Sequence, residues 1–144
     1  MSAESAVEFH TLSAKLLYLA KRTRPDKLVA VSFLISRVQC PTEKDSKKAI
    51  RVLKYLYGTK NLGIILEPGK NLVDVHAYID ASYGTHADGK SHTGVAIALG
   101  SGPVVTKSTK QKLTTKSSTE AELVALSDSA SLVLGVRNFL EAQG

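Results

Sequence analysis

Apolar positions recur at helical spacing through the first third of the chain. Within residues 8–22, Phe9, Leu12 and Leu16 fall near a 3.6-residue repeat, which predicts an amphipathic helix. Pro25 suits a first helical turn, and the mostly apolar residues 28–35 after it predict a second, largely buried helix. Three-residue spacing between Thr42 and Asp45 is that of a capping box, so a third helix is expected from there to about residue 58.

The pattern then changes to short apolar runs separated by turn residues. Runs at residues 62–66, 72–81, 93–99 and 104–108 predict strands, and turns are expected at 68–71, 87–91 and 100–103. The strands from residue 72 onward form an antiparallel meander. Along residues 72–81, alternation places Val75 and Ile79 on one face, with Tyr78 and Asp80 on the other.

A final helix is expected from about Ser117 to residue 126, and its apolar pattern resumes to residue 140. Two capping boxes compete at its start. Ser117 can pair with Glu120, or Thr119 with Glu122, and only one box can form. Spacing alone leaves open which glutamate is free for another role.

Composition adds limits on class and compartment. The 144 residues are 43% apolar with a single cysteine, Cys40, as expected of a globular protein in a reducing compartment without disulfides. Polar residues at the start and the lack of an apolar run near 18 residues predict a soluble, intracellular protein with no membrane partner. No Gly-rich phosphate loop and no serine or cysteine triad is evident.

The positive charge is unevenly distributed. Residues 1–66 carry 12 Lys and Arg against 5 Asp and Glu, whereas residues 67–144 carry 7 against 8. Four lysines precede the last helix without an acid among them, and they are candidates for holding a nucleic-acid backbone: Lys107, Lys110, Lys112 and Lys116. The alternative is a solvated basic loop.

Asp80 and the two glutamates are the candidate chemical groups. Carboxylates that converge on Mg²⁺ can support phosphodiester cleavage by two metal ions. The structural alternatives are a solvated acid at a strand end for Asp80 and first-turn acids that complement the helix dipole for the glutamates.

An ordered set of motifs resembles the Pol polyproteins of copia-type retrotransposons. Four of them, at residues 78–82, 90–94, 108–112 and 116–123, are similar to their ribonuclease H domain. Residues 16–26 and 48–59 resemble the segment that follows the reverse-transcriptase palm. The resemblance runs from about Phe9 to Gly144.

The resemblance implies an α+β chain in two parts. Residues 1–66 would be a three-helix, thumb- or connection-like segment of reverse transcriptase, and residues 67–144 a partial ribonuclease H-like domain with a three-stranded sheet and a helix. The implied activity is cleavage of the RNA strand of RNA–DNA hybrids with magnesium, or manganese. Asp80 and Glu122 would be its metal ligands, and Glu120 would cap the helix with Ser117.

Departures from the family pattern temper that expectation. The family's third and fourth metal-binding carboxylates fall beyond Gly144, so two acids alone should bind magnesium weakly. Two non-catalytic alternatives follow: a nucleic-acid-binding module, and an interaction module whose open sheet edge pairs with another chain. The expected partners are an RNA–DNA hybrid or other nucleic acid and the remainder of the polyprotein, and the family's context implies a cytoplasmic, virus-like particle.

Overall fold

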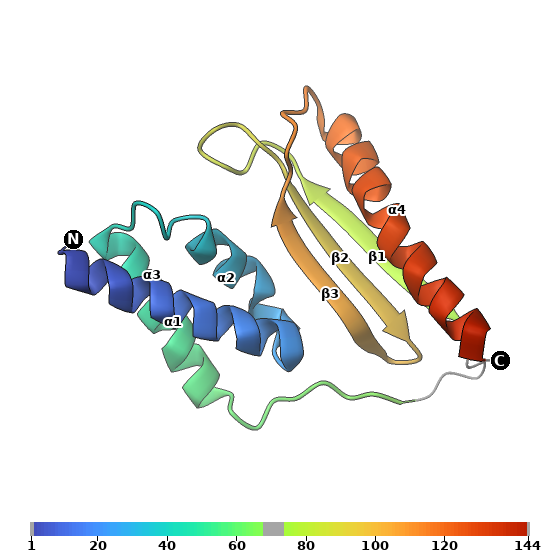
Figure 1. Cartoon of the computed structure of the whole chain (residues 1–144), viewed down its shortest axis with the longest axis horizontal. Helices are drawn as coiled ribbons and strands as arrows, with labels where there is room; N and C mark the ends of the chain where they lie inside the picture. Colours follow the sequence, from blue (N-terminus) through green and yellow to red (C-terminus); the bar gives the residue numbers. More distant parts are fainter. Residues whose placement is uncertain (1, 68–73, 144) are drawn as a thin grey trace. The chain divides into compact units, whose positions relative to one another are not determined.

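A computed structural model describes residues 2–67 and 74–143. The chain divides into two compact units, Met1–Ile64 and Ile65–Gly144. Figure 1 shows the elements of each. Helices make up the first unit, and a sheet with one long helix makes up the second. The predicted α+β class is confirmed.

The first unit contains α1 (Ala3–Arg22), a short 3-10 turn η1 (Pro25–Lys27), α2 (Leu28–Ile35) and α3 (Glu43–Gly58). The three predicted helices are therefore confirmed, with α1 beginning earlier, after the cap Ser2. Their apolar faces meet in one core, consistent with burial of amphipathic stripes as the main source of helix stability in small units. Its buried members are Phe9, Leu16, Ala20, Leu28, Val31, Leu34, Ala49 and Val52.

Local hydrogen bonds fix the start of α3 as its spacing predicts. The Thr42 side chain accepts from the backbone N–H of Asp45, and the Asp45 carboxylate accepts from the Thr42 N–H at 3.1 Å and hydroxyl at 2.6 Å. At the other end, the buried Arg24 donates to the carbonyl and hydroxyl oxygens of Thr59 at 2.9 and 2.7 Å, and also pairs with Asp26. This arginine ties the turn after α1 to the end of α3.

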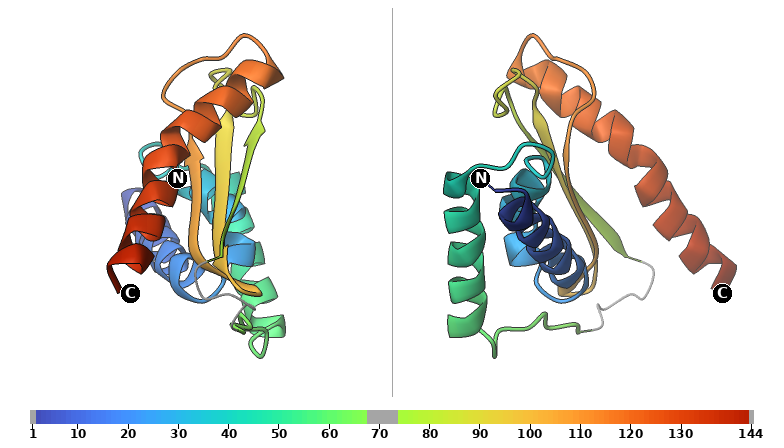
Figure 2. Two further views of the ribbon diagram at one scale, coloured as in Figure 1. Left: turned by 90° about the vertical axis from the view of Figure 1, so that its right-hand side faces the viewer. Right: turned by 60° about the vertical axis from the view of Figure 1, so that its left-hand side comes forward.

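The second unit holds a three-stranded antiparallel sheet in the order β1-β2-β3. Its strands are β1 (Val75–Ser82), β2 (His92–Leu99) and β3 (Gly102–Lys110), so the predicted meander is confirmed. The β1–β2 register pairs Val75 with Leu99 and Ser82 with His92. An irregularity between Ile97 and Ala98 shifts the β2–β3 register. α4 (Ser118–Gln143) runs along one side of the sheet and packs chiefly against β1 (Figure 2).

The strand predicted at residues 62–66 does not form. At its start, the Leu62 N–H donates to the Thr59 carbonyl at 3.0 Å. Just after the run, Glu67 bonds to the β2–β3 turn, through its N–H to Ser101 Oγ at 3.0 Å and from the Ser101 N–H to its carbonyl at 3.2 Å. These bonds do not form the regular series that joins two β-strands. The apolar run therefore does not belong to the sheet. The segment passes so close to β3 that a Cβ at Gly102 would collide with the Ile65 carbonyl. The turn predicted at 68–71 and the start of the 72–81 strand lie outside the described residues.

α4 is one uninterrupted helix of 26 residues. By length and composition alone it is apolar enough to cross a membrane. Polar residues interrupt its apolar ones throughout, so the expectation that no uninterrupted apolar run approaches 18 residues holds. Its buried residues are the small Ala121, Ala125 and Ser129, and farther along Leu132 and Val136 line a pocket with Val105 of β3.

Candidate functional site

Asp80 lies in β1, two residues before the strand ends. Its Cα partner in β2 is Gly94, so no side chain stands beside it on the neighbouring strand. The carboxylate is exposed, and within residues 2–67 and 74–143 no hydrogen bond or ion pair is recorded for it. Asp80 is thus available to a ligand from solvent.

The first turn of α4 decides between the two candidate capping boxes. The N–H of Glu120 donates to the Ser117 hydroxyl at 3.2 Å. The Glu120 carboxylate accepts from the N–H of Lys116 at 2.6 Å. Ser117 and Glu120 therefore cap the helix, although the return bond reaches Lys116 rather than Ser117 itself. A structural role for Glu120 is confirmed.

Glu122 does not take part in the helix cap. It follows the fully buried Ala121, and its own side chain is exposed. Among the described residues no hydrogen bond or ion pair is recorded for its carboxylate either. The helix therefore presents one engaged and one unengaged carboxylate in its first two turns.

The sheet register fixes the sides from which the two acids approach. The Gln111 amide donates to Thr93 Oγ1 at 3.0 Å and to the carbonyl of Ala121 at 2.9 Å, so the Thr93 face of the sheet is the one beside α4. Thr93 pairs with Ala81, which places Ala81 on that face and Asp80 on the other. An ion bound by both Asp80 and Glu122 would therefore have to lie beside β1, at the edge of the sheet.

Across the part of the chain that is described, no group of three or more His, Cys, Asp or Glu side chains is arranged to hold a metal ion. Asp80 and Glu122 would hold magnesium only as part of a larger set of ligands, since Mg²⁺ is usually bound through carboxylates with several retained waters. The structure brings their elements together through the packing of α4 on β1.

Buried polar side chains around this end of the sheet had no assigned role in the sequence-based prediction. The Ser91 hydroxyl lies 2.8 Å from that of Thr115 and accepts from the N–H of Gly84 at 3.1 Å. The Gln111 N–H donates to the Ser91 carbonyl at 2.9 Å. These bonds join the segment after β1, the start of β2 and the loop before α4. They hold in place the backbone that carries Asp80 and Glu122.

Two histidines form a second polar cluster on the helix-free face. His86 Nε2 lies 3.0 Å from His92 Nδ1, and His92 Nε2 lies 2.7 Å from Ser108 Oγ. Burial lowers the pKa of His92, and the neighbouring His86 lowers it further. The cluster therefore favours a neutral His92 imidazole.

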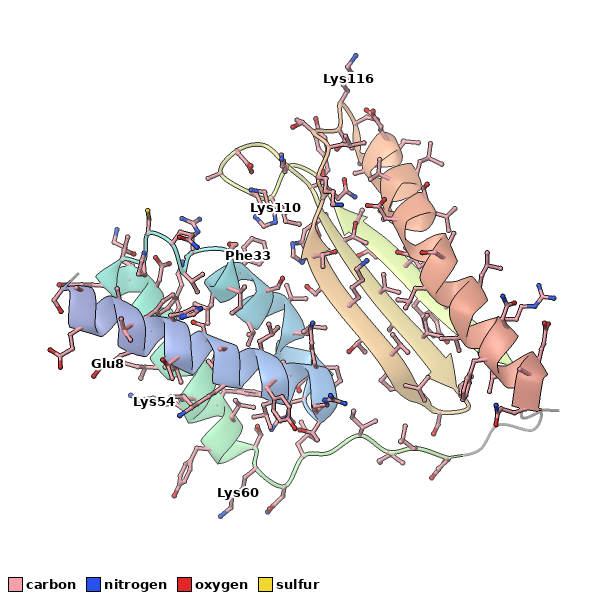
Figure 3. All side chains as sticks on the ribbon, viewed as in Figure 1. Glu8, Phe33, Lys54, Lys60, Lys110 and Lys116 are labelled. Atoms are coloured by element: carbon pink, nitrogen blue, oxygen red, sulfur yellow. The ribbon has the colours of Figure 1, made fainter. Side chains whose placement is uncertain are left out.

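The four candidate lysines are not gathered on one surface. Lys107 pairs with Val95 and Lys110 with His92, so the two point to opposite faces of the sheet. Lys110 forms an ion pair with Asp88 at 2.6 Å, which lowers the pKa of that carboxyl. Lys112 and Lys116 lie in the exposed loop before α4, and Figure 3 shows Lys116 projecting away from the sheet at the tip of that loop.

Comparison with known proteins gives the family. The chain is 38% identical over 138 residues to the retrovirus-related Pol polyprotein from transposon RE1 of Arabidopsis thaliana, with 95% of the chain covered. The chain is a homologue of copia-type retrotransposon Pol polyproteins. The corresponding RE2 protein is 37% identical over the same share of the chain. The putative transposon Ty5-1 protein of Saccharomyces cerevisiae is 33% identical over 83% of the chain and 39% of its own length.

The match covers a small part of these Pol relatives. The chain spans 9% of the length of the RE1 and RE2 polyproteins. No protein-family model matches the chain, and no solved structure matches it. By sequence similarity the chain therefore corresponds to a segment of a Pol polyprotein, and the enzymatic role of that segment is a separate question.

Proposed function

We propose that the second unit is part of a ribonuclease H-type nuclease whose Asp80 and Glu122 contribute to a magnesium site that cuts the RNA strand of RNA–DNA hybrids. The observation that carries the proposal is that the two glutamates at the start of α4 differ in their hydrogen bonding. Glu120 is used by the helix cap, whereas Glu122 and Asp80 are exposed, without recorded partners among the described residues, and lie on elements that pack together.

The chemistry fits a hard cation at the edge of β1. Carboxylate oxygens are the ligands magnesium prefers, and a bound magnesium would supply an activated water and charge stabilisation for the leaving oxygen. Asp80 and Glu122 would hold the ion, and the Ser91–Thr115–Gln111 bonds would keep their backbones in position. Completion of the site needs further oxygen ligands, from water, substrate phosphate or another segment of polyprotein.

The test is cleavage of a labelled RNA–DNA hybrid by the full chain with magnesium or manganese. Asp80→Asn and Glu122→Gln should each abolish metal-dependent cutting, whereas Glu120→Gln should retain it at a temperature where the variant is folded. Cutting that persists in both Asp80→Asn and Glu122→Gln would overturn the proposal. Complete inactivity of the wild type, with intact fold and no metal-dependent change, would leave the chain without nuclease function.

A second candidate is a non-catalytic nucleic-acid-binding module, and the net charge of +6 favours it. Binding to hybrid should then weaken steeply as salt rises, and Asp80→Asn and Glu122→Gln should leave it unchanged. Because Lys110 is paired with Asp88, Lys112→Gln and Lys116→Gln should weaken binding more than Lys110→Gln does.

A further inference from the structure

The first unit contains a cavity of about 340 Å³ that neither the nuclease proposal nor the lysine loop uses. It is lined by α2, the segment after it, and α3. Ligand sites in proteins are mostly clefts of about 300–1,000 Å³ with apolar walls and a few polar groups. This cavity falls at the lower end of that range.

Cations from two segments converge on it. Arg37 comes from the segment after α2, and Lys48 and Arg51 come from successive turns of α3. Asp45 is the one acid of the lining. Its carboxylate already accepts two hydrogen bonds from Thr42 and lies 3.8 Å from Lys48. The charge of Arg37 also helps to lower the pKa of Asp45. The lining still carries an excess of positive charge, and no salt bridge or side-chain hydrogen bond is recorded for either guanidinium group among the described residues.

The remainder of the lining is apolar. Phe33 and Val52 contribute to it, together with small and aliphatic neighbours on α2. Figure 3 places Phe33 in the second half of α2. An aromatic ring beside two arginines suits a ligand that has both a flat ring and an anionic end, because guanidinium groups bind phosphate oxygens bidentately and aromatic rings stack on bases.

We propose that this cavity binds a nucleoside phosphate, with the phosphate against Arg37, Lys48 and Arg51 and the base near Phe33. The phosphate belongs either to a free nucleotide or to the 5′ end of a single strand. The inference goes beyond the nuclease proposal, since it uses none of the residues of the second unit.

The same unit supplies a matched control. A second cavity, of about 570 Å³, lies between α1 and α3, and its charged residues are Glu8, Glu43 and Lys47. Its balance is acidic rather than basic. Lys47 and Lys48 are adjacent exposed lysines of α3, but they line different cavities. Lys47→Gln and Lys48→Gln therefore remove the same charge at neighbouring positions, and only the second changes the basic cavity.

The experiment is calorimetric titration of the full chain with AMP, pyrophosphate and a four-residue oligo-dT with or without a 5′ phosphate. AMP or the phosphorylated oligomer should bind with one site per chain. Arg37→Gln and Arg51→Gln should each weaken binding by about tenfold or more, because each removes charge-assisted, bidentate hydrogen bonds to the phosphate. Lys48→Gln should weaken binding less, because lysine binds phosphate as a point charge. Lys47→Gln should change the dissociation constant by less than about twofold, because salt screens the attraction between an exposed lysine and a ligand in the other cavity.

The aromatic contact has its own readout. Phe33→Leu keeps an apolar side chain and should weaken AMP binding by about fivefold or more while leaving pyrophosphate binding unchanged. Binding of AMP but not of the phosphorylated oligomer identifies a free nucleotide. Tighter binding of the phosphorylated oligomer, with at least about tenfold loss when its phosphate is absent, identifies a strand end.

Two results would overturn the proposal. One is no binding of AMP, pyrophosphate or phosphorylated oligomer by the folded wild type. The other is equal weakening by Lys47→Gln and Arg51→Gln, with no dependence on the terminal phosphate, which would show diffuse attraction to a basic helix. Asp80→Asn should bind these ligands as the wild type does, so failure of the nuclease proposal and failure of this one are distinguishable.

Discussion

The side-chain amide of Gln111 donates to the backbone carbonyl of Ala121 at 2.9 Å and so joins the segment after β3 to the first turn of α4. The same amide nitrogen donates to Thr93 in β2. Gln111 is only 3% exposed. One side chain therefore sets the position of the turn that carries Glu122 relative to the sheet.

Replacement of Gln111 by Leu should destabilise the second unit by about 1–2 kcal/mol, because Thr93 Oγ1 and the Ala121 carbonyl lose a donor while volume is largely kept. Loss of the buried Gln111 Oε1, for which no partner is recorded among the described residues, offsets part of this cost. Chemical denaturation of the full chain, followed by probes in each unit, measures the change. The helical unit should unfold as in the wild type. The matched control is Lys112→Gln, a change at the adjacent exposed position, which should alter stability by less than about 0.5 kcal/mol. Equal stability of Gln111→Leu and wild type would contradict the anchoring role.

Glu120 and Glu122 should separate stability from metal binding. Glu120→Gln loses a charged acceptor for the Lys116 N–H and a favourable interaction with the helix dipole, and should lower stability by about 0.5–1 kcal/mol. Glu122→Gln should leave the unfolding free energy nearly unchanged and weaken magnesium binding. Thermal unfolding with and without magnesium measures both effects. The reverse pattern would mean that the cap uses the other glutamate.

Local sequence rules predicted the parts of this structure that depend on local contacts. The Thr42–Asp45 cap, the helices of the first unit and the alternation along β1 all follow from spacing within a few residues. Residues 62–66 have the same apolar character as a strand, but whether a run pairs depends on a neighbour far away in the sequence. The role of Gln111 could not be predicted from local spacing either, because its partners Thr93 and Ala121 lie 18 and 10 residues away in the sequence.

Asp45 should make the first unit sensitive to acid. Hydrogen bonds from Thr42 lower the pKa of this buried carboxyl below its ordinary value. A lowered folded-state pKa means that the stabilisation is complete above the unfolded pKa of about 3.9 and is lost as pH falls through the folded value. Asp45→Asn should flatten this acid limb of a plot of stability against pH, whereas Glu43→Gln, an exposed change in the same turn, should keep it. An unchanged acid limb in Asp45→Asn would exclude this source.

His92 should make the second unit sensitive at higher pH. Its folded pKa is lowered by burial and by His86, so the folded state binds fewer protons than the unfolded state near the ordinary value of about 6.5. Stability is therefore complete above that pH and falls as pH drops from about 6.5 towards the folded pKa. Melting of the second unit, measured from about pH 8 to about pH 5, should show this decline in the wild type and in His76→Gln, an exposed histidine of β1.

The variant His92→Gln should lower stability at about pH 8, because it disturbs the bonds to His86 and Ser108, and should lose most of the decline below about pH 7. A decline of equal size in His92→Gln would assign the titration to another group. The decline from His92 begins below its ordinary pKa of about 6.5, whereas the decline from Asp45 begins only below the ordinary Asp value of about 3.9. The two units should therefore lose stability in separate steps as the solution is acidified.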